Sequence, residues 1–189
     1  MGALPIMIKR LLSLLGLVAC LSAAGVPALA QDLVINRPAP PFRAKTFDGR
    51  EVSLAEYRGQ VLIINFWATW CGPCKKELPF LEGYYRAAQD KNYGLKILAV
   101  TKEDSIPIDR LKPLAAQVHF DMARNFQGPY SVLAGLPTNY IIDRNGILRY
   151  AKADAFDLDS LNAVLTPLLQ QPMPADAAPG PTKASFAPN

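Results

Sequence analysis

Cysteine and histidine are scarce in this chain, which has 189 residues but only three cysteines and one histidine. A secreted disulfide scaffold needs more cysteines at wider separations, and a structural zinc site needs about four ligands. Cys20 lies in an apolar N-terminal segment, which leaves one close pair, Cys71 and Cys74, and the single His119. The composition therefore argues against a disulfide-stapled fold and predicts no metal site. A bridge across so short a loop adds little stability, so chemistry explains the pair better.

The chain also lacks a strong excess of charge of one sign, because its formal net charge is only +4. Without Lys9 and Arg10 in the N-terminal segment, 18 basic residues stand against 16 acidic ones. Nucleic-acid binding requires a clustered excess of Lys and Arg, so this near-neutral mixture argues against it.

The first thirty residues have the pattern of an export signal. Lys9 and Arg10 precede an uncharged run over 11–30 that ends in Ala28-Leu29-Ala30, an A-x-A cleavage site. Two other interpretations stay open. The string Leu17-Val18-Ala19-Cys20 resembles a lipobox in which Cys20 is lipidated, and the uncharged run is long enough to span a bilayer uncleaved. All three place the following domain outside the cytoplasm, in the periplasm or on the outer face of a bacterial inner membrane.

A β-α-β unit is predicted over 61–101. Val61–Trp67 is a continuous β-branched and aromatic run, typical of a strand that is buried on both faces. Lys75–Lys91 has helical apolar spacing, and Leu95–Thr101 is a second buried strand. Cys71 and Cys74 therefore lie where a strand passes into a helix, and reactive groups collect at the carboxyl ends of strands in such units.

Weaker patterns predict the remaining elements of a folded domain over 31–170. The Asp48-Gly49 pair indicates a hairpin turn, and the Asn145-Gly146 pair indicates a second one. Further expected elements are helices over 54–57, 105–117, 122–126 and 158–169 and strands over 139–142 and 147–152. The Pro- and Ala-rich segment 171–189 has no periodicity, so we expect a disordered tail.

The cysteine pair has the spacing and position of a reversible disulfide. Residues three apart in the first turn of a helix lie on one face, so Cys71 and Cys74 can form and break a bond with little backbone motion. The helix N-terminus offers free N–H groups and partial positive charge, which stabilise a thiolate at Cys71. Pro73 has no backbone N–H, but an N–H in the first turn of a helix has no acceptor within that helix, so nothing is lost. Lys75 and Lys76 add positive charge nearby. We expect Cys71 to attack a substrate disulfide and Cys74 to resolve the mixed disulfide.

The string Trp70-Cys71-Gly72-Pro73-Cys74 resembles the active site of thioredoxins. Its longer context, Asn65 to Pro79, is similar to the bacterial TlpA and ResA thiol-disulfide reductases, and the lead-in around Asp48-Gly49 is similar also to that of peroxiredoxins. The resemblance covers roughly 36–169. It implies an α/β thioredoxin-like fold: a central mixed sheet flanked by helices, an N-terminal β-hairpin extension and an αβ insertion before a cis-proline.

The resemblance also implies site residues beyond the cysteines. Pro137, in the string Gly135-Leu136-Pro137-Thr138, matches the family's cis-proline, which lies beside the cysteine pair and exposes the backbone of Leu136 to an extended substrate peptide. Glu77 matches an acidic residue that tunes the cysteines of ResA-like proteins. Asn65 stands where thioredoxins carry a buried acid, and an amide cannot titrate. Trp70 is expected on the docking surface, whereas Trp67 is expected in the core.

The function implied is reduction of disulfides in exported proteins, with electrons from a membrane thiol carrier and no bound cofactor. Cytochrome c maturation and copper-oxidase assembly are the processes that the resemblance suggests. Three alternatives stay open. They are a disulfide-forming oxidase on the same cysteines, a thiol peroxidase with Thr69 before Cys71, and a Cu(I) chaperone that binds metal through the two thiolates.

Overall fold

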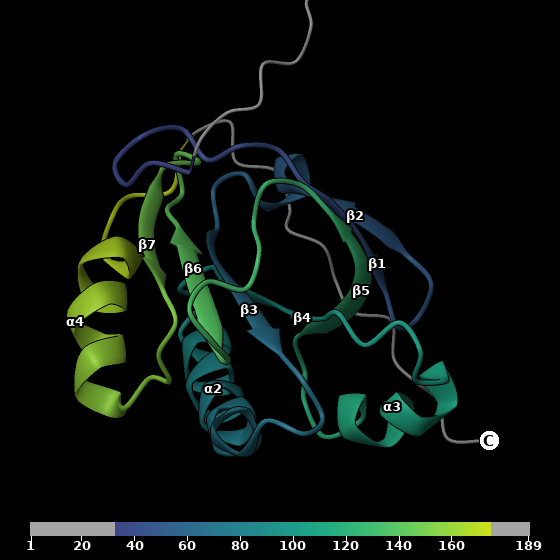
Figure 1. Cartoon of the computed structure of the whole chain (residues 1–189). Helices are drawn as coiled ribbons and strands as arrows, with labels where there is room; N and C mark the ends of the chain where they lie inside the picture. Colours follow the sequence, from purple (N-terminus) through teal and green to yellow (C-terminus); the bar gives the residue numbers. More distant parts are fainter. Residues whose placement is uncertain (1–32, 175–189) are drawn as a thin grey trace, which may run out of the picture. The chain divides into compact units, whose positions relative to one another are not determined.

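A computed structural model describes residues 33–174, which form a seven-stranded mixed sheet with three α-helices and one 3-10 helix (Figure 1). The predicted leader over 1–30 and most of the predicted tail lie outside the described residues. Within the described part, no helix is both long and apolar enough to cross a bilayer. In chain order the elements are β1 (Arg43–Thr46), β2 (Glu51–Ser53), η1 (Leu54–Tyr57), β3 (Val61–Trp67), α2 (Gly72–Asp90), β4 (Leu95–Thr101), α3 (Ile108–Ala115), β5 (Asp121–Gln127), β6 (Thr138–Ile142), β7 (Leu148–Lys152) and α4 (Leu158–Leu169).

The strands lie in the order β2-β1-β5-β4-β3-β6-β7, which confirms the expected thioredoxin-like α/β architecture. Strand β3 is an interior strand, because it pairs in parallel with β4 and antiparallel with β6. Figure 1 shows β7 and α4 on one side of the molecule and the β1–β2 hairpin on the other. The hairpin turns at Asp48-Gly49, where Gly49 has φ +91°, a backbone conformation that glycine adopts at little cost.

Every residue of β3 is buried because both faces of the sheet are covered, as the unbroken apolar run predicts. Alternate residues Val61, Ile63 and Trp67 pack with the three α-helices. Leu62 and Ile64 point the other way and pack with Ala39, with Phe42 and with the β1–β2 hairpin. The first of these cores contains both cysteines of the predicted redox pair, so the reactive end of α2 is built on a strand that is buried along its whole length.

Between β4 and β6, one expected helix is wrong and a second is shorter than expected. Residues 122–126 belong to β5 and not to a helix, because they form the ladder between β1 and β4, and this long-range pairing overrides their local helical propensity. The helix expected over 105–117 is reduced to α3, which starts after its N-cap Pro107. His119 is mostly exposed, and its Nδ1 lies 2.5 Å from Oε1 of Glu82 on α2.

Arg144 closes the opposite end of the sheet from the cysteines. Its buried guanidinium donates hydrogen bonds to the carbonyl oxygens of Gly59 at 3.0 Å, Tyr93 at 2.7 Å and Leu169 at 3.0 Å. These carbonyls come from three separate segments: the turn before β3, the turn after α2 and the end of α4. One side chain therefore ties together the far ends of both long helices.

Candidate active site

Cys71 and Cys74 form a disulfide at the start of α2, with their Cα atoms 5.3 Å apart. Cys71 is the N-cap residue of this helix, and its sulfur accepts a hydrogen bond from the backbone N–H of Cys74 at 3.1 Å. Only 4% of Cys71 is exposed, and Cys74 is completely buried. Because Cys71 is the residue nearer the surface and faces free helical N–H groups, it is the sulfur suited to nucleophilic attack.

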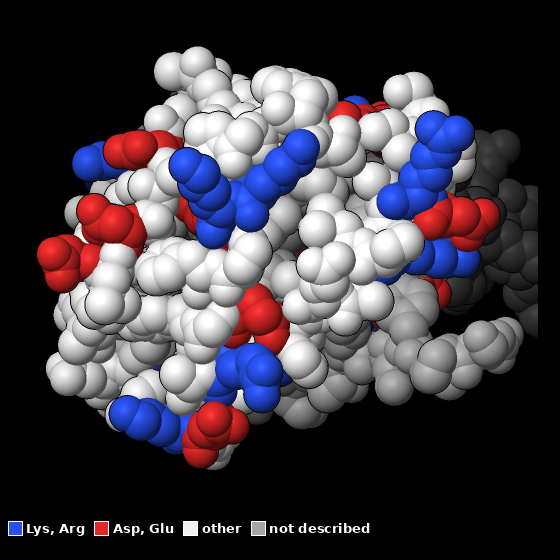
Figure 2. Space-filling model, turned by 90° about the horizontal axis from the view of Figure 1, so that it is seen from below, with Lys and Arg blue, Asp and Glu red and all other residues white. Residues whose placement is uncertain are grey.

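The surface around the disulfide combines one large aromatic ring with scattered charges. Trp70 is 72% exposed immediately before Cys71, whereas Trp67 is buried. Gly72, Pro73, Lys75 and Lys76 are exposed in the first turn of α2. Figure 2 views the end of the molecule where α2 begins, and there basic and acidic side chains are interspersed among uncharged ones. Such a surface favours contact through Trp70 over strong electrostatic attraction of a charged partner.

The loop before β6 supplies the second wall of this site, and its Leu136–Pro137 peptide bond is cis, as the resemblance implies. Phe66 is the partner of Thr138 in the β3–β6 ladder, so Pro137 lies at the carboxyl end of β3, where the chain leaves for the cysteines. Leu136 packs against the core that contains both cysteines. The hydroxyl of Thr138 donates to the Gly135 carbonyl at 2.6 Å, which stabilises the bend of the loop.

Glu77 lies on α2 one helical turn after Cys74 and is buried, with an exposed fraction of 3%. Its carboxylate accepts a hydrogen bond from Asn65 Nδ2 at 2.8 Å, from Asn139 Nδ2 at 2.9 Å and from the Phe156 N–H at 2.9 Å. Asn65 Nδ2 also donates to Asn139 Oδ1 at 2.8 Å. The position that is acidic in thioredoxins is therefore an amide here, and the buried carboxylate is supplied by the helix.

Two opposing effects act on the carboxyl group of Glu77. Burial raises its pKa, since the charged form loses its hydration, and the three hydrogen-bond donors lower the pKa again. The net direction is upward from the ordinary value. A buried carboxyl group with a raised pKa, one helical turn beyond Cys74, is suited to exchange a proton with the cysteine site.

Two members of this network, Asn139 and Phe156, were not expected from the sequence. Asn139 is paired with Asn65 in the β3–β6 ladder, so the two amides meet only through the sheet register. Buried asparagines in two apolar strands are the signal that could have revealed them. Phe156 contributes its backbone N–H, which has no sequence signature. Phe156 and Glu77 also line a hollow of about 460 Å³ beside the first turn of α2, next to Gly72 and Pro73.

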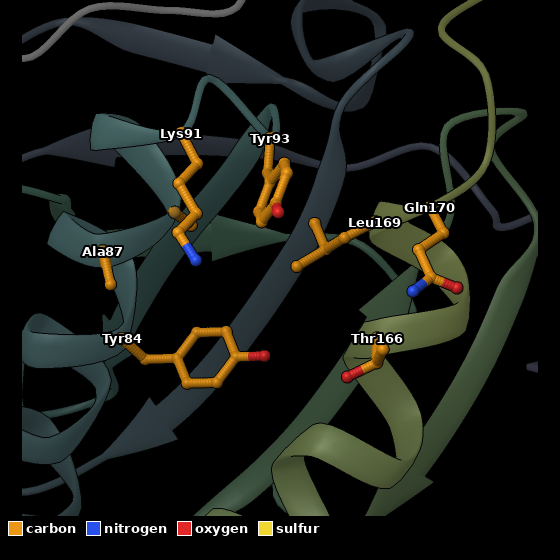
Figure 3. Close-up of a pocket in the computed structure, with 8 residues that line it drawn as sticks. Tyr84, Ala87, Lys91, Tyr93, Thr166, Leu169 and Gln170 are labelled. Atoms are coloured by element: carbon orange, nitrogen blue, oxygen red, sulfur yellow. The ribbon is translucent and has the colours of Figure 1, made fainter.

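A second hollow, of about 290 Å³, lies at the other end of α2 (Figure 3). Tyr84 and Lys91 face Thr166 and Leu169 of α4 across it. The 19 residues of α2 make it about 28 Å long, so this hollow is far from the disulfide. Within residues 33–174, no group of three His, Cys, Asp or Glu side chains is placed to bind a metal ion.

Comparisons with known proteins agree with this geometry. A family model described as the AhpC/TSA family matches residues 35–151. The thiol-disulfide oxidoreductase ResA of Bacillus cereus is 31% identical over 140 residues, which are 72% of this chain and 79% of that protein. ResA of Oceanobacillus iheyensis is 32% identical over 169 residues, which are 84% of this chain and 86% of that protein.

The same class of protein is found among solved structures. A Chlorobium tepidum protein assigned as thiol:disulfide interchange protein DsbE shares 31% identity and a TM-score of 0.61, over 73% of this chain and 99% of its own. The fold, the disulfide at the helix start and these relatives all lead to one class of chemistry. The chain therefore belongs to the AhpC/TSA family and is a ResA-like thiol-disulfide oxidoreductase of the thioredoxin superfamily.

Proposed function

We propose that this oxidoreductase reduces disulfides in exported proteins, with Cys71 as nucleophile and Cys74 as resolving cysteine. The observation that carries the proposal is the position of Cys71 at the N-cap of α2, where its sulfur accepts the Cys74 N–H at 3.1 Å. That hydrogen bond and the helix dipole stabilise a negative sulfur more than a neutral thiol.

The reaction proceeds by two exchanges between sulfur atoms. In the reduced enzyme the Cys71 thiolate attacks one sulfur of the substrate disulfide, which forms a mixed disulfide and releases the other substrate sulfur as a thiolate. The Cys74 sulfur, after losing its proton, then attacks Cys71 Sγ and releases the second substrate thiolate. Two electrons have passed to the substrate, whose two thiolates then take up protons from solvent, and the enzyme keeps the Cys71–Cys74 disulfide.

The other site residues serve this exchange. Glu77 accepts the proton that Cys74 loses. Asn65 holds the Glu77 carboxylate in place through its hydrogen bond. The backbone of Leu136, before the cis peptide bond at Pro137, pairs with an extended segment of the substrate, while Trp70 contacts the segment beside its target cysteine. Gly72, Pro73 and Thr138 shape the two walls between which the substrate disulfide enters.

The export pattern over 1–30 supports action outside the cytoplasm, in the periplasm or at the outer face of the inner membrane. A membrane thiol carrier would then return electrons to the Cys71–Cys74 disulfide. Apocytochromes c and copper-delivery proteins of oxidase assembly are the substrates that the family likeness favours, and the exchange needs no bound cofactor.

The direction of electron flow is tested by the reduction potential of the cysteine pair. A potential of about −270 mV supports a reductase, and a value of about −120 mV would indicate a disulfide-forming oxidase instead. Substrates are identified by trapping with the Cys74→Ala variant, which stops the reaction at the mixed disulfide. We expect exported proteins with paired cysteines to be recovered through Cys71. A Cys71→Ser/Cys74→Ala variant is the control, and equal recovery with it would refute the proposed role of Cys71.

A further inference from the structure

Glu103 makes a two-pronged contact with the turn that leads into the cysteine pair. This residue follows the end of β4 by two positions and is half-buried. Its Oε2 accepts the backbone N–H of Thr69 at 2.6 Å, and its Oε1 accepts the Thr69 hydroxyl at 2.8 Å. Thr69 and Glu103 are 34 positions apart in sequence and meet only because β4 lies beside β3 in the sheet.

The carboxylate of Glu103 is itself attached to the sheet. The hydroxyl of Thr101, the last residue of β4, donates to Glu103 Oε2 at 3.3 Å and accepts the Glu103 N–H at 3.2 Å. Thr101 is 1% exposed and is the ladder partner of Trp67, the last residue of β3. Glu103 therefore connects a fixed point of the sheet to the turn between Trp67 and Cys71.

This turn determines where the nucleophile stands. It contains one backbone hydrogen bond, from the Cys71 N–H to the Ala68 carbonyl at 3.1 Å, and the Thr69 N–H bonds to a side chain instead. Without Glu103, Thr69 would lose the partners of both its N–H and its hydroxyl, and the turn would gain freedom. The Cys71 sulfur would then spend less time at the helix N-cap that stabilises its thiolate.

We infer that Glu103 is a positioning residue for the nucleophilic sulfur, acting through Thr69. The inference rests on the proposed role of Cys71 as nucleophile. The carboxylate also has an opposing effect. Two residues of chain span at most about 7 Å, so Glu103 lies within about 10 Å of Cys71, and its negative charge disfavours a thiolate. Position and charge therefore act on the Cys71 thiol pKa in opposite directions.

Two variants separate these effects. Glu103→Gln keeps an acceptor for Thr69 and removes the charge, so we expect the Cys71 thiol pKa to fall by less than about one unit. Glu103→Ala removes both, and because the loss of position outweighs the loss of charge, we expect the pKa to rise by roughly 0.5 to 1.5 units. The measurement is the pH dependence of iodoacetamide alkylation of Cys71 in the full-length reduced protein, with the modified residue identified by mass.

Turnover gives a second readout. Glu103→Ala should lower kcat/KM on a protein disulfide about tenfold, and Glu103→Gln should retain most of it. Glu51→Ala, an exposed glutamate on the edge strand β2, is the control and should change neither readout. If Glu103→Ala does not fold, Thr69→Val takes its place. It removes the hydroxyl contact, leaves the charge and should also raise the pKa.

Three results would overturn the inference. The first is a lower Cys71 pKa in both Glu103 variants, which would mean that Glu103 acts only as a repelling charge. The second is an unchanged Cys71 pKa in Glu103→Ala. The third is an unchanged or lower Cys71 pKa in Thr69→Val. The proposed function fails separately, if the wild-type Cys71 thiol titrates like an ordinary cysteine or if the wild-type protein does not reduce disulfides.

Discussion

Replacing Glu77 by Gln tests whether burial or hydrogen bonding dominates at the carboxyl group beneath the cysteines. The variant keeps the size of the side chain and removes its ability to ionise. In the native protein this carboxyl is buried among three donors, and its pKa is raised above the ordinary value of 4.5. The variant should therefore change how the stability of the protein depends on pH.

The sign follows from proton linkage. A carboxyl whose pKa is higher in the folded than in the unfolded protein stabilises the fold fully below the unfolded pKa. That contribution is lost as pH rises through the folded pKa. Each unit of upward displacement corresponds to about 1.4 kcal/mol of unfolding free energy. Glu77→Gln lacks this loss, so the stability of the variant relative to wild type should rise from pH 4 to pH 8.

The difference in unfolding free energy between variant and wild type at pH 4 follows from the hydrogen bonds of residue 77. In the variant, the Gln oxygen can still accept from Asn139 and Phe156, but its NH₂ group faces the donor of Asn65. One unmade hydrogen bond costs about 1 kcal/mol, so at pH 4 the variant should be about that much less stable than wild type. By pH 8 the deficit should have shrunk or reversed.

The assay is urea unfolding of the oxidised protein at a series of pH values, since disulfide-bonded cysteines do not titrate and leave the profile undisturbed. Glu51→Gln removes an exposed carboxylate from β2 and controls for the general effect of net charge. A deficit of Glu77→Gln that grows toward pH 8 would refute the reasoning, because it would mean that the three donors hold the carboxylate ionised.

Three further substitutions have distinct expected results. Trp70→Ala removes a side chain that is 72% exposed, so the free energy of unfolding should change by less than about 0.5 kcal/mol. The kcat/KM on a protein disulfide should fall several-fold, whereas the rate of reaction with a small disulfide should stay the same. Arg144→Met leaves three backbone carbonyls without their donor and should cost about 3 kcal/mol in urea unfolding, with the reduction potential unchanged. Asn139→Asp places a second carboxylate against Glu77 and should cost about 3 kcal/mol at pH 7, with recovery below about pH 4. Equal instability of Asn139→Asp at both pH values would contradict that explanation.

The elements that sequence patterns predict well are those decided by local residues. Val61–Trp67 is apolar throughout because it is covered on both faces, and the following Cys-Gly-Pro-Cys marks the helix start within a few residues. The helix over 158–169 is predicted with its observed bounds, since its apolar spacing coincides with an Asp157 N-cap.

Contacts between distant parts of the chain explain the rest. Segment 121–127 is a strand only because β1 and β4 accept it between them. The donors to Glu77 come from positions 12, 62 and 79 residues away, so their meeting depends on sheet register and not on spacing. The acidic residue at 77 was recognised through resemblance, whereas Glu103 lies in a segment with no motif and becomes visible only in the folded chain.

The contacts of Arg144 and those around the cysteine pair are separated by the length of α2 and share no residue. Substitutions at two such places are expected to have additive effects on stability. Sequence drift or engineering can therefore strengthen the anchored end and create a reserve of stability, while the residues around the sulfurs are free to change for a new substrate. The length of α2 thus separates the end of the molecule where substitutions change substrate specificity from the end where substitutions change the free energy of unfolding.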